Sequence, residues 1–272
     1  MSKFIVGDMH GCYDKLKTSL ELAKFSSNDV LYAVGDYCDR GTQNLAVIEY
    51  LMSLKGRFKG CFGNHDIWIW QYLHPLVNNK PYMSRDVDSC WHLNGGDSTL
   101  KELANLSDTK KAEIFEWFSN LPYIIDLDNY IITHALPEEW LYNDLKDVNL
   151  TNLTIKECLE NNYCVKDYDN WFWGRYIDKG LFLKDKFNVE EIKDIKKKLD
   201  TFYKHTSNTL YIIGHTPYLE NSPNYNLEAG IINLDCASFA SKDKYGKEGA
   251  VCIMNLDTKE WFKSDGTIGV IS

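Results

Sequence analysis

The feature that most constrains this chain is a repeated join of an apolar run to a short polar motif. Three runs near the start of the chain, at 4–6, 30–34 and 58–62, lead into GDMHG, GDYCDRG and GNHD. Asp8, Asp36 and Asn64 therefore stand 28 residues apart, which is one strand–helix unit each. This order predicts a parallel sheet with right-handed crossovers. In such sheets ligands bind at the carboxyl ends of the strands, so we expect the three side chains to lie together.

Helical periodicity fills the two segments between these runs. Leu16, Leu20 and Ala23 share one helical face, and Asp14 is a candidate N-cap for that helix. The segment QNLAVIEYLMSL carries a second apolar stripe. These two helices are the predicted crossovers between the three strands.

Later apolar runs also end in polar residues. Residues 130–133 lead into His134, residues 210–213 lead toward His215, and residues 230–234 lead into Asp235. The segment GAVCIMNLDTKEWF then reads as a hairpin with its turn near 255–259. Since these strands are numerous and the last pair is antiparallel, we expect more than one sheet.

The polar residues at these strand ends have the chemistry of a two-metal site. The set comprises Asp8, His10, Asp36, Asn64, His134 and His215. Carboxylate, amide and imidazole ligands suit manganese, iron, zinc, cobalt or nickel, and the lack of thiolates argues against a structural zinc site. Two cations about 3.5 to 4 Å apart need a bridging carboxylate. Asp36, which follows the middle strand, is the predicted bridge.

Composition limits the domain organisation, the cellular compartment and the partners that we expect. The 272 residues are 44% hydrophobic and 25% charged, which fits one domain over 1–272. No apolar run reaches membrane-spanning length, and the start is acidic too early for a signal peptide, so we expect a cytoplasmic protein without a membrane partner. Eight irregularly spaced cysteines predict reduced thiols. A net charge of −9 argues against nucleic-acid partners. No long heptad occurs, so a monomer is expected.

These motifs resemble those of the calcineurin-like metallophosphoesterases, within them the phosphoprotein phosphatase group that includes bacterial and phage serine/threonine phosphatases. The resemblance rests on GDMHG, GDYCDRG, GNHD, His134 and GHT at 214–216, and on the WHLNGGDSTL segment from Trp91. It implies an α/β (α+β) fold, a two-sheet β-sandwich flanked by helices in four layers. The metals would lie at one end of the two sheets.

The resemblance also implies roles for individual residues. Asp8, His10 and Asp36 match the ligands of one metal, and the second set of ligands is Asp36, Asn64, His134 and His215. His65 matches the general acid that protonates the leaving alkoxide, and Asp39 matches the acid that orients it. Arg40 and Arg175 match phosphate-binding arginines, and Asn64 also lies on the substrate side. The cofactors would be two divalent cations, with manganese first and iron, zinc, nickel or cobalt as alternatives.

The implied function is hydrolysis of phosphomonoesters through attack by a metal-bridging hydroxide, with a phosphorylated protein or small phosphoester as substrate. We expect a serine/threonine protein phosphatase, because the symmetrical diadenosine tetraphosphate hydrolases that share the fold often lack an acid at the position of Asp39. Such a hydrolase is the alternative. A phosphate-binding module with decayed activity is the non-enzyme alternative.

Long excursions interrupt the motifs around 75–120 and 137–205. Both are rich in tryptophan, and we interpret Trp91, Trp117, Trp140 and Trp171 as small cores beneath these insertions. Trp173 adjoins Arg175, so the second insertion is expected to cover part of the metal site. The lysines at 193–198 are interpreted as a solvated helix face. Cys12 and Cys38 lie near the first two motifs and are interpreted as apolar filling, with oxidation at Cys38 as a sharper hypothesis.

Overall fold

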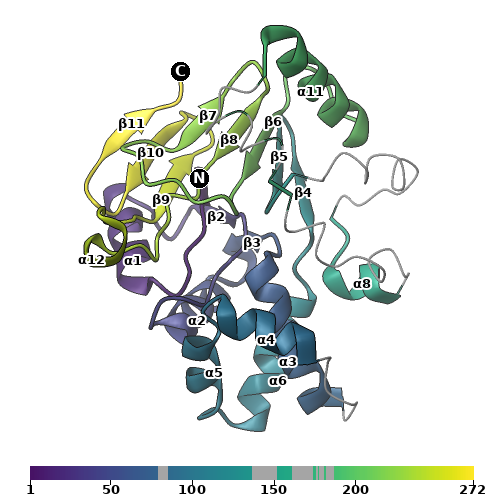
Figure 1. Cartoon of the computed structure of the whole chain (residues 1–272), viewed down its shortest axis with the longest axis vertical. Coiled ribbons are helices and arrows are strands. Elements are labelled where there is room, and N and C mark those ends of the chain that lie inside the picture. Colours follow the sequence, from purple (N-terminus) through teal and green to yellow (C-terminus); the bar gives the residue numbers. More distant parts are fainter. Residues whose placement is uncertain (79–84, 137–151, 161–173, 176, 178–180, 182–186) are drawn as a thin grey trace.

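The structure is a computed structural model that describes residues 1–78, 85–136, 152–160, 174, 175, 177, 181 and 187–272. Two β-sheets face each other, and helices cover their outer sides (Figure 1). The predicted fold class, a two-sheet sandwich flanked by helices, is confirmed. The helices α2 to α6 gather at one end of the molecule, below the sheets in the view of Figure 1. None of the described helices is long and apolar enough to cross a bilayer.

The first sheet combines the predicted parallel strands with the predicted hairpin. Its strands are β1 (Lys3–Val6), β2 (Val30–Ala33), β3 (Phe58–Gly60), β9 (Cys252–Asn255), β10 (Glu260–Lys263) and β11 (Ile268–Val270). The order is β11-β10-β9-β1-β2-β3. β1 pairs in parallel with β2, and β2 with β3, whereas β9 runs antiparallel to β1. The three motif-bearing strand ends therefore meet at one edge, as their spacing predicts.

The second sheet carries the later motifs. Its strands are β4 (Ile124–Leu127), β5 (Tyr130–Thr133), β6 (Leu210–Ile213), β7 (Asn224–Asn226) and β8 (Ile231–Asn233). The order is β4-β5-β6-β8-β7, and β5, β6 and β8 are parallel. Because these three strands share one direction, His134, His215 and Asp235 follow them at the same edge of the sheet.

Alternating side chains separate the two layers of core. In β1, Ile5 joins the cluster between the sheets, which includes Ile132 and Ile232 of the second sheet. Phe4 and Val6 face the other way and pack with the helices. This is the period-two pattern of a strand buried on both faces. The sheets are thereby fixed against each other, and the loops at their shared end are held in place.

Helices fill the connections on the outer faces. They are α1 (Tyr13–Leu22), α2 (Asn44–Ser53), the 3-10 turn η1 (Lys55–Arg57), α3 (Asn64–Asn78), α4 (Arg85–Leu93), α5 (Asp97–Leu103), α6 (Asp108–Ser119), α8 (Ile155–Glu160), α11 (Val189–Phe202) and α12 (Lys242–Tyr245). The insertion around 75–120 is thus helical. Most of the 137–205 insertion, with Trp140, Trp171 and Trp173, lies outside the described residues.

One local prediction was wrong, and a second holds only in part. Asp14 is not the N-cap of α1, because the helix begins at Tyr13 and Cys12 holds the cap position. The Asp14 carboxylate instead accepts a hydrogen bond from Gln43 Nε2 at 2.8 Å. Among the lysines at 193–198, Lys193, Lys197 and Lys198 are exposed as predicted, whereas the Lys196 side chain is buried, pairs with Asp200 and lies over the ring of Tyr211. Sequence periodicity places a residue on a face but does not show how far its side chain reaches.

Several motif residues have a strained backbone. The φ angles are positive at His10 (42°), Asp36 (53°), Asp39 (71°), Arg40 (67°) and His215 (69°). Non-glycine residues adopt this region rarely, and it persists only where the surroundings impose it. The sharp turns after the strands thus direct these side chains toward one another.

Candidate metal centre

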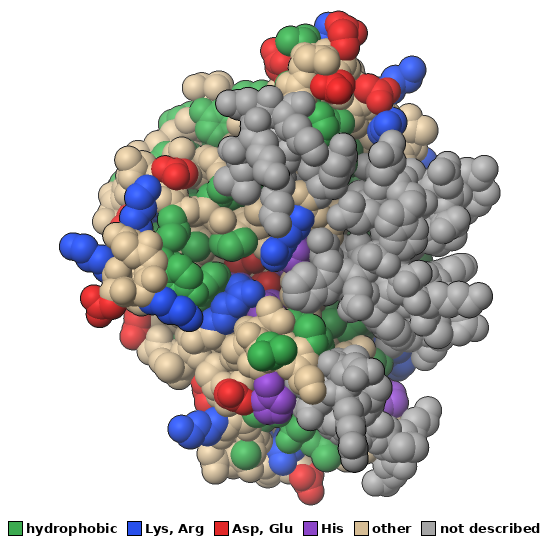
Figure 2. Space-filling model, viewed as in Figure 1, with side chains coloured by type: hydrophobic (Ala, Val, Ile, Leu, Met, Phe, Trp, Pro, Cys, Tyr) green, Lys and Arg blue, Asp and Glu red, His purple; other side chains and the backbone are tan. Residues whose placement is uncertain are grey.

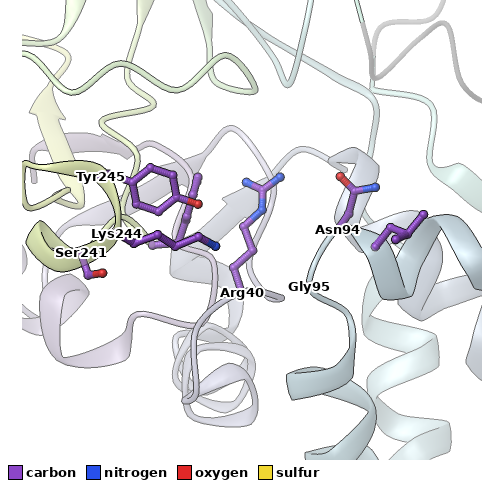
Figure 3. Close-up of a pocket in the computed structure, with 8 residues that line it drawn as sticks. Arg40, Asn94, Gly95, Ser241, Lys244 and Tyr245 are labelled. Carbon is purple, nitrogen blue, oxygen red and sulfur yellow. The ribbon is translucent and has the colours of Figure 1, made fainter.

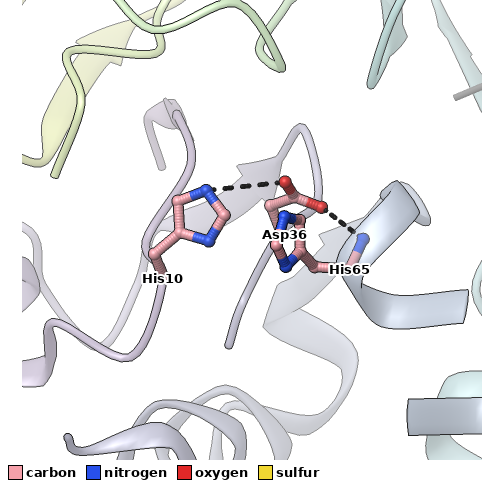
Figure 4. A group of neighbouring side chains, drawn as sticks. All are labelled: His10, Asp36 and His65. Carbon is pink, nitrogen blue, oxygen red and sulfur yellow. Dashed lines mark hydrogen bonds and ion pairs between the residues drawn. The ribbon is translucent and has the colours of Figure 1, made fainter. Parts of the chain in front are cut away.

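Asp36 lies at the middle of the predicted ligand set. Its Oδ1 is 3.4 Å from His134 Nε2, and its Oδ2 is 3.6 Å from His10 Nε2. Figure 4 shows the contacts of Asp36 with His10 and with the backbone nitrogen of His65. Two groups of possible ligands, Asp8–Asp36–His134 and His10–Asp36–His65, each have their donor atoms within 4.8 Å of one another. Asp36 belongs to both groups, which is the arrangement that a bridging carboxylate needs.

Asn64 from the first sheet meets the two histidines of the second sheet. Asn64 Oδ1 lies 3.0 Å from His134 Nε2 and 2.9 Å from His215 Nδ1. Asn64 is the first residue of α3, directly after the loop that follows β3. The structure therefore brings all six residues of the predicted ligand set to the shared end of the two sheets.

Backbone carbonyl groups orient two of the imidazoles. His10 Nδ1 lies 2.9 Å from the carbonyl oxygen of Cys38, and His134 Nδ1 lies 3.0 Å from that of Val34. Each Nδ1 is assigned the proton from these partners, which leaves a lone pair on each Nε2. The Nε2 lone pair of His134 then faces oxygen lone pairs of Asn64 and Asp36. Lone pairs that face each other repel, and a cation bound between them would turn this repulsion into attraction.

Burial gives the cluster its electrostatic character. Burial, followed by the nearby Asp235 and Asp36, raises the pKa of Asp8 well above its ordinary value. Burial also lowers the pKa values of His10 and His215, which keeps both rings neutral and competent as ligands. Among the described residues, the buried Asp8 Oδ1 has no hydrogen-bond partner. An unpartnered carboxylate oxygen beside neutral imidazoles fits divalent cations.

His65 and Asp39 form a separate buried pair. His65 Nδ1 lies 2.6 Å from Asp39 Oδ2, and both side chains are inaccessible to solvent. Asp39 is itself held by Thr99, whose hydroxyl donates to Asp39 Oδ1 at 2.5 Å, and by Trp91, whose indole N–H donates to Asp39 Oδ2 at 2.8 Å. The carboxylate thus accepts three side-chain hydrogen bonds, which fix the orientation of the imidazole.

Trp91 corrects the interpretation of the first insertion. Its ring is buried, but it does not merely fill a core, because its N–H anchors Asp39. The WHLNGGDSTL segment carries both Trp91 and Thr99, and its Gly95 carbonyl accepts the backbone N–H of Arg40 at 3.0 Å. The insertion therefore supports the second motif from outside. Trp117 follows the prediction and stacks on Phe58 in the core.

Two arginines point into the cluster. Arg40 Nη1 lies 2.7 Å from His10 Nε2, and Nη2 lies 2.9 Å from His65 Nε2. The Arg40 guanidinium also stacks over the ring of Phe239 at 4.4 Å. Arg175 donates from Nε to His215 Nε2 at 2.9 Å and from Nη2 to the His215 carbonyl at 3.1 Å. Both predicted phosphate-binding arginines thus reach the site.

Two further acids lie at the site to which the sequence analysis assigned no role. Asp66 accepts backbone N–H groups of Asp36, Tyr37 and Gly63 at 2.8 to 3.0 Å, so it holds the loop that aims Asp36. Asp235 is buried after β8, where burial raises its pKa to about 6. Its position directly after a strand is the sequence signal that could have identified Asp235 as a site residue.

His65 has two interpretations in this geometry. The metal-competent group His10–Asp36–His65 includes it as a ligand, whereas its contact with Asp39 fits an acid–base role. The Asp39 contact occupies Nδ1, and Nε2 already receives Arg40. We retain the acid–base role as a proposal, and metal content in a variant separates the two.

Comparisons with known proteins agree with this geometry. The family model described as calcineurin-like phosphoesterase matches residues 1–219. A protein of Pasteurella multocida named symmetrical bis(5'-nucleosyl)-tetraphosphatase is 29% identical over 187 residues, covering 66% of this chain and 58% of its own length. One of the same name from Mannheimia succiniciproducens is 30% identical, covering 72% and 64%. The matches thus span less than two thirds of either relative.

A solved structure matches the fold over the whole chain. The crystal structure of a cold-active protein-tyrosine phosphatase of a psychrophilic Shewanella species superposes with a TM-score of 0.57 at 20% identity, covering 100% of this chain and 80% of that one. At this identity the likeness concerns the fold alone. Since the family model covers most of the sequence and includes every motif at the strand ends, the chain belongs to the calcineurin-like phosphoesterase family.

Proposed function

We propose that this chain is a dinuclear, metal-dependent phosphoric ester hydrolase. The observation that carries the proposal is the position of Asp36, which is shared by two groups of possible ligands. Asp8, His10 and Asp36 would hold one cation, and Asp36, Asn64, His134 and His215 would hold the other. Manganese is the first candidate for both. Two bound cations would supply a nucleophile derived from water and positive charge for the phosphate oxygens.

The arginines would bind the substrate phosphate. A phosphate monoester carries two negative charges, and catalysis requires positive charge around the transferring group. Arg40 and Arg175 each present a planar fork of N–H donors, which matches two phosphate oxygens. Their present acceptors are imidazole nitrogens and a carbonyl, so a phosphate entering the site would offer both of them stronger, charged acceptors.

His65 would protonate the leaving group. The Asp39 carboxylate lies 2.6 Å from Nδ1 and fixes the ring, so Nε2 is the nitrogen available to donate a proton to the substrate. Arg40 Nη2 donates to the same Nε2 at 2.9 Å, so the arginine must turn to the phosphate before Nε2 can carry this proton, and the phosphate-binding group then lies beside the proton donor. Thr99 and Trp91 then act as positioning residues through Asp39.

The substrate we propose is phosphoserine or phosphothreonine in a protein. A serine or threonine alkoxide is strongly basic and leaves only with a proton, which the His65–Asp39 pair provides. The second candidate is a dinucleoside tetraphosphate, which is favoured by the names of the two relatives. Its leaving group is a nucleoside diphosphate, which is weakly basic and needs no such acid.

A side-by-side assay separates the candidates. The protein reconstituted with Mn²⁺ is given a phosphothreonine peptide and diadenosine tetraphosphate, and the products are resolved by chromatography. We expect peptide turnover with little nucleotide cleavage. Symmetrical cleavage to two diphosphates without peptide turnover would keep the metal chemistry but overturn the substrate. Two bound metals with neither activity would favour a binding module.

A further inference from the structure

A pocket opens beside Arg40, outside the metal cluster. Its volume is about 400 Å³, and its lining includes Arg40, Asn94, Phe239, Ser241, Lys244 and Tyr245. Figure 3 shows Arg40 between two walls, with Lys244 and Tyr245 of α12 on one side and Asn94 on the other. We call this cavity the Arg40–Lys244 pocket. Because Arg40 is also the proposed phosphate-binding residue, the pocket adjoins the reacting end of the substrate.

The charge of this pocket is opposite to that of the whole protein. Among the described residues that line it, Arg40 and Lys244 are cations and none is an acid. The chain as a whole carries a net charge of −9. In Figure 2, Lys and Arg side chains also lie beside the recess at the centre of the face, where acid and histidine side chains are visible. A local cationic wall on an acidic protein favours an anionic ligand at that place.

The lining residues indicate which kind of anionic group the pocket suits. The Phe239 ring carries the Arg40 guanidinium on one face at 4.4 Å, and its neighbour Tyr245 lies edge-on to it with the ring centroids 5.9 Å apart. Lys244 Nζ lies 5.2 Å from the Tyr245 ring centroid. The aromatic rings therefore hold cations in place rather than offering a slot in which a base could stack between two faces. Hydroxyl, amide and ammonium groups complete a site suited to a carboxylate or phosphate.

The pocket wall is fixed to the rest of the fold. Lys15 Nζ donates to the carbonyl oxygens of Ser238 and Gly249 at 2.9 and 2.8 Å, and it pairs with Glu248 at 2.7 Å. These residues bracket the segment that carries Phe239 and α12. The wall is thus preorganised, and a ligand need not order it.

We propose that the Arg40–Lys244 pocket binds a second anionic side chain of a phosphorylated peptide, close in sequence to the phosphorylated residue. This inference rests on the proposed phosphatase function and adds a preference for acidic phosphopeptides. Arg40 holds the scissile phosphate at the pocket's inner edge. Lys244, with the hydroxyl groups of Ser241 and Tyr245, receives the flanking carboxylate or phosphate.

The test compares two peptides and two variants. Both peptides carry one phosphothreonine, flanked in one by glutamates and in the other by glutamines. Lys244→Gln removes the pocket ammonium, and Lys242→Gln is the matched control, since Lys242 lies on the same helix but not in the pocket. A small aryl phosphate measures basal activity. Anisotropy of labelled peptides with a non-hydrolysable phosphonate measures binding without turnover.

We expect the wild-type protein to prefer the acidic peptide by about five- to tenfold in kcat/KM, as a charge-assisted contact at a partly exposed site allows. The phosphonate peptides should give the same ranking in Kd, and the preference should shrink as salt increases. Lys244→Gln should reduce it to about twofold or less, whereas Lys242→Gln keeps it. Aryl phosphate turnover should be unchanged in both variants.

Three outcomes would overturn the inference. The first is an equal preference for the acidic peptide in the wild-type protein and in Lys244→Gln. The second is an equal loss of that preference in both variants. The third is a loss of diadenosine tetraphosphate cleavage in Lys244→Gln while the peptide preference stays intact. The last result would assign the pocket to a polyphosphate. Failure of the proposed function is separate: loss of the hydrolase chemistry would abolish metal-dependent turnover of the aryl phosphate itself, and a wrong substrate class would leave that turnover in place with neither peptide hydrolysed.

Discussion

Asp39 Oδ2 lies 2.6 Å from His65 Nδ1 in a pair that is closed to solvent. If the pair delivers a proton, its contribution depends on how basic the leaving group is. Asp39→Asn should lower kcat on a phosphothreonine peptide by about 10²-fold. On an aryl phosphate, whose phenolate leaves more readily, the loss should be much smaller. An equal loss on both substrates would show that Asp39 has another role.

His65→Asn separates the two interpretations of this histidine. We expect kcat on a phosphopeptide to fall by about 10² to 10⁴, the range of general acid catalysis. Metal content, measured by elemental analysis of the purified variant, should stay at the wild-type value. Loss of one equivalent of metal would instead make His65 a ligand, as the His10–Asp36–His65 group permits.

Asp36→Asn should affect both cations together. Asn keeps the size of the side chain but removes the charge that both ligand groups share. We expect metal stoichiometry and the thermal stabilisation by Mn²⁺ to fall together. Asp66→Asn is the comparison variant, because Asp66 binds the backbone of the Asp36 loop and is not in either ligand group. An unchanged metal count in Asp36→Asn would remove its assignment as the bridge.

The positions of the ligands could be predicted because they depend on local order. Asp8, Asp36 and Asn64 each follow a short apolar strand, and a repeat of strand and helix brings their strand ends together. His134 and His215 follow the same rule in the second sheet. Periodicity and turn chemistry carry this information within a few residues of each ligand.

The supporting contacts could not be predicted because they join segments remote in sequence. Trp91 reaches Asp39 across 52 residues, and this depends on how α4 and α5 pack against the second motif. The short polar strand β7 (Asn224–Asn226) has no apolar alternation to reveal it. The single-domain organisation over 1–272 stays a prediction.

Stabilisation by metal should depend on pH. Burial raises the pKa of Asp8, so the metal-free folded protein favours the protonated carboxyl. The contribution of Asp8 to stability is therefore lost as pH rises past the ordinary carboxyl range. Burial lowers the pKa of His10, so stability is also lost as pH falls below the ordinary imidazole value. Cations bind the carboxylate and the neutral imidazole.

The increase in melting temperature on adding Mn²⁺ should therefore be larger at about pH 7.5 than at about pH 5.5, where protons compete for the ligands. Differential scanning fluorimetry with and without Mn²⁺ at the two pH values measures this. The same increase at both values, or a larger one at the lower, would contradict the assignment of Asp8 and His10 as ligands.

The central claim is that hydrolysis depends on two cations held around Asp36. The most direct measurement is a titration of the chelator-treated protein with Mn²⁺, with turnover of an aryl phosphate and bound metal recorded at each step. The account predicts no turnover without metal and a plateau at two bound ions per chain. Full turnover after complete metal removal, or no turnover with two ions bound, would contradict it.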